Sequence, residues 1–255
     1  MGKPTLANRL RAGDLVYSGW IATPEPLIAE YTARQAFDCV SLDMQHGLHD
    51  PVSVMHSIGG IALAGKPAAV RIPVGDFAMA SRALDMGAEA VIAPMINSVA
   101  DARAFVAATK YPPLGERSWG PARALAVLDI PDAATQLATA NRDTLAFAMV
   151  ETREAVGILD EILAIDGVDG VFMGPSDLSL TYSDGKEVAP AADWVDEPIR
   201  HIAARARAHG KIACAFATDP KRARYFNEVG YQFVAMGPDA LYLAAGIKVM
   251  LEGLR

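Results

Sequence analysis

The feature that most constrains this chain is a repeated unit, in which a short apolar run is followed by a longer segment of helical period. The runs do not alternate between apolar and polar residues, so each is expected to be buried on both faces, as strands of parallel sheets are. Repeated units of this kind predict an α/β fold built on parallel strands. There are eight runs, at 16–21, 39–42, 68–72, 90–93, 146–150, 170–173, 212–216 and 233–236.

Eight strand and helix units in 255 residues predict one (β/α)8 TIM barrel, a fold that typically needs about 250 residues. The predicted domain covers residues 1–255, because no linker or low-complexity tract divides the chain. An open, doubly wound sheet is the alternative architecture. No G-x-G-x-x-G motif follows the first run, which argues against a dinucleotide-binding sheet.

Helical segments lie between the apolar runs, and several end at a glycine that precedes the next strand. Glycine readily adopts the left-handed backbone that terminates many helices. Gly87, Gly167, Gly210 and Gly230 are expected to do so. The predicted helices span 76–86, 99–109, 153–164, 193–209 and 220–229.

Composition and charge limit the partners of this chain. A formal net charge of -7, with no basic run, argues against nucleic acid and anionic membranes. The first ten residues lack the apolar core of a signal peptide, and no segment approaches about 18 consecutive apolar residues. A cytoplasmic protein with small-molecule partners is therefore expected. Cys39 and Cys214 lie within apolar runs and are predicted to be buried rather than reactive.

Polar side chains follow four of the apolar runs, at the strand ends where TIM barrels carry their chemistry. Asp43 and His46 follow the second run, Arg71 lies near the end of the third, Glu151 follows the fifth and Asp177 follows the sixth. Because all strands of such a barrel point the same way, these side chains are expected to meet at one rim.

Glu151 and Asp177 are candidate metal ligands. Two carboxylates at one barrel mouth repel each other unless a cation or a shared proton relieves them. Mg²⁺ and Mn²⁺ favour a few carboxylate oxygens and fill their remaining positions with water or substrate. The alternative is structural, with Glu151 capping or pairing with a basic residue and Asp177 capping a short helix together with Ser176.

Four other residues are candidates for substrate binding or proton transfer. The Arg71 guanidinium is suited to a bidentate grip on a carboxylate or enolate oxygen, and a structural salt bridge is its alternative. His46, close to Asp43, is a candidate base near neutral pH, although a lone histidine is commonly only structural. Arg117 and Arg123 belong to the long connection 111–124, which is rich in Pro, Gly and Arg, and are candidate anion contacts over the mouth, or parts of a plain turn.

Six fragments, in this order and spanning nearly the whole chain, closely resemble the class II pyruvate aldolases of the HpcH/HpaI family. They are Leu42-Asp43-Met44-Gln45-His46-Gly47, the strand end at Arg71, Ala93-Pro94-Met95-Ile96-Asn97-Ser98, Pro112-Pro113 with Gly115-Glu116-Arg117-Ser118, Glu151-Thr152-Arg153-Glu154-Ala155, and the segment from Gly170 to Ser179.

The resemblance implies a lyase that reversibly cleaves a 4-hydroxy-2-oxo acid to pyruvate and an aldehyde. It implies that Glu151 and Asp177 bind a divalent cation, which can be Mg²⁺, Mn²⁺, Co²⁺ or Zn²⁺. It further implies that Arg71 holds the 2-oxo oxygen, and that His46, paired with Asp43 or Asp85, transfers the proton of the C4 hydroxyl. The segment Gly174, Pro175, Ser176 and Asp177 would seat the pyruvate carboxylate through backbone N–H groups.

The chain departs from this resemblance at three places that concern the aldehyde half of the substrate. Some relatives have Gln where this chain has Met149, an Arg where it has Leu114, and Leu-Gly where Leu180-Thr181 begins a longer loop. The family commonly forms hexamers, as trimers of dimers, in which the last helices exchange between neighbours. Residues 241–251 are therefore expected to pack on a partner subunit.

Two other functions fit the same residues. One keeps the site and changes the bond that breaks, as in oxaloacetate decarboxylation or citryl-CoA-type lysis, although no basic groove for a nucleotide is evident in the sequence. The other is a non-catalytic barrel that binds keto acids.

Overall fold

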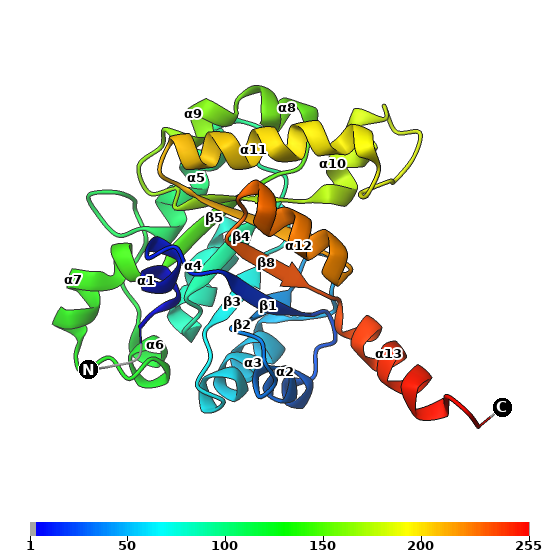
Figure 1. Ribbon diagram of the computed structural model, residues 1–255. Helices are drawn as coiled ribbons and strands as arrows, with labels where there is room; N and C mark the ends of the chain where they lie inside the picture. Colours follow the sequence, from blue (N-terminus) through cyan, green and yellow to red (C-terminus); the bar gives the residue numbers. More distant parts are fainter. Residues whose placement is uncertain (1–3, 255) are drawn as a thin grey trace.

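A computed structural model describes residues 4–254 and shows a closed barrel of eight parallel strands, paired in sequence order, with the last strand joined to the first (Figure 1). The predicted (β/α)8 barrel is confirmed, and the open sheet is excluded. Residues 1–3 and 255 of the predicted domain lie outside the described residues. The strands are β1 (Val16–Ile21), β2 (Cys39–Asp43), β3 (Ala68–Arg71), β4 (Ala90–Ala93), β5 (Leu145–Val150), β6 (Gly170–Met173), β7 (Ile212–Ala217) and β8 (Phe233–Met236).

Helices surround the barrel, and most of the predicted ones are present (Figure 1). The predicted helix at 153–164 is two short helices, because the segment breaks at Gly157 and Ile158, where glycine weakens a helix. The predicted helix at 193–209 begins with a separate 3-10 turn. The helices are α1 (Leu6–Arg11), α2 (Pro26–Ala33), α3 (Pro51–Leu63), α4 (Phe77–Met86), α5 (Val99–Thr109), α6 (Ala122–Val127), α7 (Ala133–Asp143), α8 (Arg153–Gly157), α9 (Leu159–Leu163), α10 (Pro175–Tyr182), η1 (Asp193–Val195), α11 (Asp196–Ala208), α12 (Pro220–Val229) and α13 (Asp239–Leu251).

Short polar residues and glycines set where the helices begin and end. Asp76 and Asp219 accept backbone N–H groups in the first turns of α4 and α12. The same two helices end at Gly87 and Gly230, whose φ angles of 106° and 109° are left-handed. These boundaries were predicted from the sequence because each depends on residues next to it in the chain.

The core has two layers, one inside the barrel and one between the strands and the helices. Aromatic rings fill the interior, where the Phe147 and Phe233 centroids lie 5.9 Å apart. The two cysteines belong to this interior and are fully buried, as predicted. Burial raises the pKa of the Cys39 thiol to about 12 and that of Cys214 well above its usual value, so neither is a nucleophile near neutral pH.

The last helix, α13, departs from the barrel (Figure 1). Only its first residue, Asp239, is buried, and it accepts the backbone N–H groups of Ala22 and Thr23. Beyond that point the helix exposes apolar side chains, including Leu243 at 67% and Met250 at 78%. No helix within residues 4–254 is long and apolar enough to cross a membrane.

An ion cluster at the amino-terminal rim joins the strands that carry the candidate metal ligands. Asp169, directly before β6, accepts from Lys110 Nζ at 2.6 Å, from Arg11 Nη2 at 2.8 Å and from the backbone N–H of Ala146 in β5. Lys110 is buried, and it also donates to the backbone carbonyls of Asn141 and Thr144. The cluster therefore fixes the starts of β5 and β6 relative to each other.

Replacing Asp169 with alanine is expected to destabilise the protein strongly, because it leaves the buried Lys110 ammonium without a counter-ion. Breaking one partner of a buried pair typically costs about 3 kcal/mol or more. At about 2–4 °C per kcal/mol, the melting temperature should fall by roughly 10 °C in calorimetry. The matched control is Asp160→Ala, which removes a largely exposed partner of Arg205 and should change the melting temperature little. Equal losses in both variants would contradict this role of Asp169.

Candidate active site

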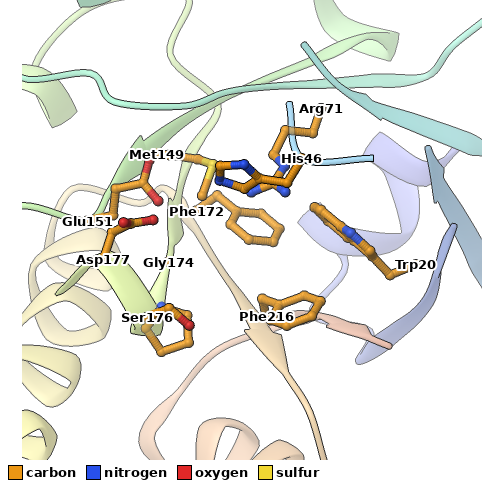
Figure 2. A pocket seen from close by; sticks show the side chains of 11 residues that line it. Trp20, His46, Arg71, Met149, Glu151, Phe172, Gly174, Ser176, Asp177 and Phe216 are labelled. Atoms are coloured by element: carbon orange, nitrogen blue, oxygen red, sulfur yellow. The ribbon is translucent and has the colours of Figure 1, made fainter. Parts of the chain in front are cut away.

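The carboxyl ends of the strands surround a cavity of about 260 Å³ (Figure 2). The cavity brings together four of the residues singled out in the sequence, namely His46, Arg71, Glu151 and Asp177. Figure 2 shows the two carboxylates on one side of the cavity and aromatic rings on the other. The full lining is Trp20, His46, Arg71, Met149, Glu151, Phe172, Gly174, Pro175, Ser176, Asp177 and Phe216.

Glu151 follows β5 directly and is almost completely buried, with 1% exposure. Its Oε1 accepts the backbone N–H of Met95 at 2.8 Å. Met95 adopts a left-handed φ of 55°, which is strained for a residue with a side chain and here directs its N–H at the carboxylate. On the other side, a Cβ at Gly174 would lie 2.2 Å from Oε2 of Glu151, so only glycine lets the backbone approach the carboxylate this closely.

Asp177 lies in the first turn of α10, beside Glu151. The helix begins at Gly174 without any side-chain cap, so the capping role proposed for Asp177 and Ser176 as an alternative is not observed. No ion pair of Glu151 or Asp177 with a basic side chain occurs within the described residues. The structural alternatives from the sequence therefore do not account for this pair of carboxylates.

The environment of Glu151 disfavours its charged form. The pKa of Glu151 is raised to about 7, chiefly by burial and also by the negative charge of Asp177, while the Met95 N–H and the charge of Arg71 act to lower it. A bound cation would reverse this balance, since it favours the deprotonated carboxylate.

The donor set suits a hard divalent cation. It consists of two adjacent carboxylates, one of them buried, opening on a cavity with room for water or substrate oxygens. In the part of the chain that the structure describes, no group of three or more His, Cys, Asp or Glu side chains is arranged to hold a metal. A site here would accordingly use two protein ligands and leave most positions open.

Arg71 and Asp43 form a bidentate pair at the opposite side of the mouth. Arg71 donates from Nε to Oδ1 at 2.8 Å and from Nη2 to Oδ2 at 2.7 Å. Burial alone would raise the pKa of Asp43, but the hydrogen bonds and charge of Arg71, with the backbone N–H groups of Gln45 and His46, lower it below its usual value. Arg71 is thus held by a salt bridge and still lines the cavity.

His46 lines the cavity, in the turn that follows β2. Asp43 Oδ1 accepts the backbone N–H groups of Gln45 at 3.0 Å and His46 at 3.4 Å, which shapes this turn. Among the described residues, the His46 imidazole makes no hydrogen bond or ion pair, and the carboxylate of Asp43 is directed to Arg71. The structure therefore places Asp43 beside the His46 backbone rather than against its ring.

Asp85 and Arg117 lie together, away from the mouth of their own barrel. Asp85 is in the last turn of α4, the end of the helix that leads into the start of β4. Its Oδ1 accepts from Arg117 Nη2 at 2.5 Å, and the Arg117 guanidinium lies 4.5 Å from the centroid of the Tyr111 ring. Arg117 is buried, whereas the Asp85 side chain is 30% exposed. Neither residue lines the cavity.

Arg123 is also outside the cavity. It begins the first turn of α6 and donates from Nη2 to the backbone carbonyl of Met55 in α3 at 2.9 Å. The arginines predicted to reach over the mouth are thus directed elsewhere within the subunit, because the loop that carries them follows α5 to the opposite rim.

Sequence reasoning missed several residues of the cavity. Trp20, Phe172 and Phe216 lie inside the apolar runs that predict strands, and Met95, which does not line the cavity, donates to Glu151 from the loop after β4. An aromatic residue one or two positions before the end of a barrel strand is the signal that was available for Trp20, Phe172 and Phe216. Met95 carried no such signal, because its contribution is a backbone N–H.

Comparisons with known proteins identify the family of this chain. A family model described as HpcH/HpaI aldolase/citrate lyase matches residues 17–245. The chain belongs to the HpcH/HpaI family. The assignment made from the sequence fragments is confirmed.

The relatives match almost the whole length of this HpcH/HpaI protein. The hydroxypyruvate/pyruvate aldolase of Rhizorhabdus wittichii is 37% identical over 243 residues, which cover 95% of each chain. The 4-hydroxy-2-oxovalerate aldolase of Novosphingobium aromaticivorans is 33% identical over 247 residues, covering 96% of this chain and 91% of that relative. A crystal structure of a family protein from Burkholderia cenocepacia J2315 is 27% identical, with a TM-score of 0.87, covering 99% of this chain and all of that one.

The affinity of the metal-free protein for Mn²⁺ is expected to decrease as the pH is lowered, because protons compete with the cation for Glu151. The raised pKa of about 7 means that Glu151 is ionised above that pH and protonated below it. Affinity measured by calorimetry should therefore decrease from about pH 8 to about pH 6, approaching roughly tenfold per pH unit below the pKa. Glu151→Gln should bind weakly at both values. An affinity of the unsubstituted protein that does not change over this range would contradict the assignment of Glu151 as a ligand.

Proposed function

We propose that this protein is a divalent-metal-dependent pyruvate aldolase, a carbon–carbon lyase that reversibly cleaves a 4-hydroxy-2-oxo acid to pyruvate and an aldehyde. The observation that carries the proposal is the pair Glu151 and Asp177, a buried carboxylate beside a second one, without a cationic partner among residues 4–254 and facing Arg71 and His46 across one cavity. The aldolase names of two relatives that match over nine-tenths of their length support it.

Glu151 and Asp177 would hold the cation. The proposal specifies a divalent cation, which can be Mg²⁺, Mn²⁺, Co²⁺ or Zn²⁺. When bound, a divalent cation supplies Lewis acidity to the oxygens of a keto acid. The α10 N-terminus supports a place for the substrate carboxylate, because no side chain caps its first backbone N–H groups, at Ser176 and Asp177.

Arg71 would donate to the 2-oxo oxygen as negative charge builds on it. Asp43 occupies Nε and Nη2 of this guanidinium, which leaves Nη1 for the substrate. His46, on the same rim, would accept the proton of the C4 hydroxyl during cleavage and return it during addition. Asp43 therefore acts in this proposal by fixing Arg71 and the turn of His46.

The test is exchange of the methyl protons of pyruvate in deuterated water, followed by proton NMR. Exchange should require a divalent cation, stop on addition of EDTA and be absent in Glu151→Ala, because forming the enolate is the half-reaction common to pyruvate aldolases. Glu154→Ala, an exposed glutamate three residues away, is the matched control and should exchange normally. Exchange that survives chelation would overturn the proposal.

Further measurements on the same protein separate the other two functions. An oxaloacetate decarboxylase would release CO₂ from oxaloacetate and fail to join pyruvate to any aldehyde of a panel. A non-catalytic barrel would bind pyruvate, measured by calorimetry in the presence of metal, without exchange and without turnover.

We also propose that the protein is a homo-oligomer, a hexamer built as a trimer of dimers, in which α13 packs on a neighbouring subunit. The exposed apolar side chains of α13 support this, because only the first residue of the helix, Asp239, is buried against its own barrel. Because Asp85 lies at the rim opposite its own His46, the proposed pairing of these two residues requires Asp85 from another subunit. The partly exposed side chain of Asp85, held by Arg117, fits that role.

Co-expression of two inactive variants tests this arrangement. In oligomers that mix His46→Ala and Asp85→Ala subunits, a site with its own His46 and a neighbour's Asp85 should regain activity. Random mixing should restore about a quarter of the native aldolase rate, whereas each variant alone stays inactive. Mixed oligomers, verified by mass spectrometry, that show no activity above the single variants would contradict a shared site.

A further inference from the structure

We propose that Trp20 is a positioning residue for the reaction, which fixes the Arg71 and Asp43 pair in the orientation that directs Arg71 at the substrate. This inference rests on the proposed function, since it assigns Trp20 a part in the enolate step. Trp20 belongs to β1 and faces the cavity with only 3% exposure.

Trp20 contacts both members of the pair. Its indole Nε1–H donates to Oδ2 of Asp43 at 3.4 Å, the same oxygen that accepts from Arg71 Nη2. Its ring also lies against the guanidinium, with 4.8 Å between the Arg71 Cζ and the ring centroid. One side chain thus restrains the carboxylate through its edge and the guanidinium through its face.

Two aromatic rings pack on the Trp20 indole, and a hydrogen bond holds its backbone. Phe172 and Phe216 pack on the indole, with centroids at 6.0 Å and 5.2 Å (Figure 2). Its backbone N–H donates to the hydroxyl of Tyr242 at 3.1 Å, and that hydroxyl donates to the backbone carbonyl of Met236. The indole therefore has little freedom to move with the groups that it holds.

This restraint matters because the two hydrogen bonds between Arg71 and Asp43 hold the two side chains in one plane. They do not fix how that plane is oriented relative to the cavity. Arginine has several rotatable bonds, and a pair that moves as a unit can still turn Nη1 away from the substrate. A catalytic group displaced by about 1 Å can cost on the order of 100-fold in rate. Trp20 supplies the third contact that removes this freedom.

The competing role for Trp20 is that of a plain wall of the cavity. A wall contacts the ground state and the transition state alike, so its loss raises KM and leaves kcat unchanged. A positioning residue acts on an interaction that strengthens as the enolate forms, so its loss lowers kcat. The two roles are therefore separated by steady-state kinetics of pyruvate exchange.

Trp20→Phe keeps an aromatic ring and removes the N–H donor. We expect kcat of metal-dependent exchange to fall roughly 10- to 100-fold, with KM for pyruvate changed less than about twofold. Trp194→Phe, a matched change of a partly exposed tryptophan in η1, should leave both constants unchanged. An increase in KM alone in Trp20→Phe would overturn the proposal.

A double-mutant cycle asks whether Trp20 acts through Arg71. In an Arg71→Lys background, which cannot form the bidentate pair, Trp20→Phe should lower the remaining kcat by less than about twofold. Independent, multiplying losses in the double variant would show that Trp20 acts by another route and overturn the proposal.

A crystal structure of Trp20→Phe supplies a readout that needs no activity. We expect Arg71 to leave its bidentate contact with Asp43 or to occupy more than one rotamer. An unchanged pair would overturn the proposal even if the unsubstituted protein showed no exchange. Absence of exchange in the unsubstituted protein, with the pair displaced in the variant, would instead overturn only the proposed function.

Discussion

The burial of one carboxylate, that of Glu151, is the constraint on which the site depends. A charge removed from water in an apolar barrel is costly unless other groups compensate it. The barrel supplies one backbone N–H, from Met95 in a left-handed conformation, and the close approach of Gly174. No basic side chain in the described part of the chain forms an ion pair with Glu151, and the charge of Arg71 compensates it only in part, so the remaining compensation falls to a proton or a metal ion.

The same rim holds a second buried carboxylate, Asp43, whose pKa is lowered where that of Glu151 is raised. Arg71 and two backbone N–H groups keep Asp43 ionised, whereas burial and Asp177 disfavour the ionised form of Glu151. Carboxylates with pKa values pushed apart in one cavity are typical of sites that divide chemical roles among them. In the proposed function the division is between binding a cation and orienting an arginine, and the contacts of Trp20 with Arg71 and Asp43 extend the second role.

The residues of the opposite rim stabilise the fold. In the proposed oligomer, one of them, Asp85, also contributes to the site of a neighbouring subunit. The Asp169 cluster fixes the starts of β5 and β6, the two strands whose far ends present Glu151 and Asp177. Asp85 and Arg117 lie near the ends of α4 and α5, because each barrel helix returns the chain to the amino ends of the strands. A helix residue can therefore be essential to the chemistry and still lie far from the mouth of its own subunit.

The sequence by itself determined the barrel and placed His46, Arg71, Glu151 and Asp177 at one rim. Runs of apolar residues, helix caps such as Asp76 and Gly87, and polar residues after strands are local signals, and parallel strands necessarily collect their ends at one mouth. Only the tertiary structure decided how those residues are paired. Asp43 contacts Arg71 rather than the His46 ring, Trp20 joins that pair, and Met95 serves Glu151 through its backbone, because such contacts join strands far apart in the chain and depend on register and rotamer.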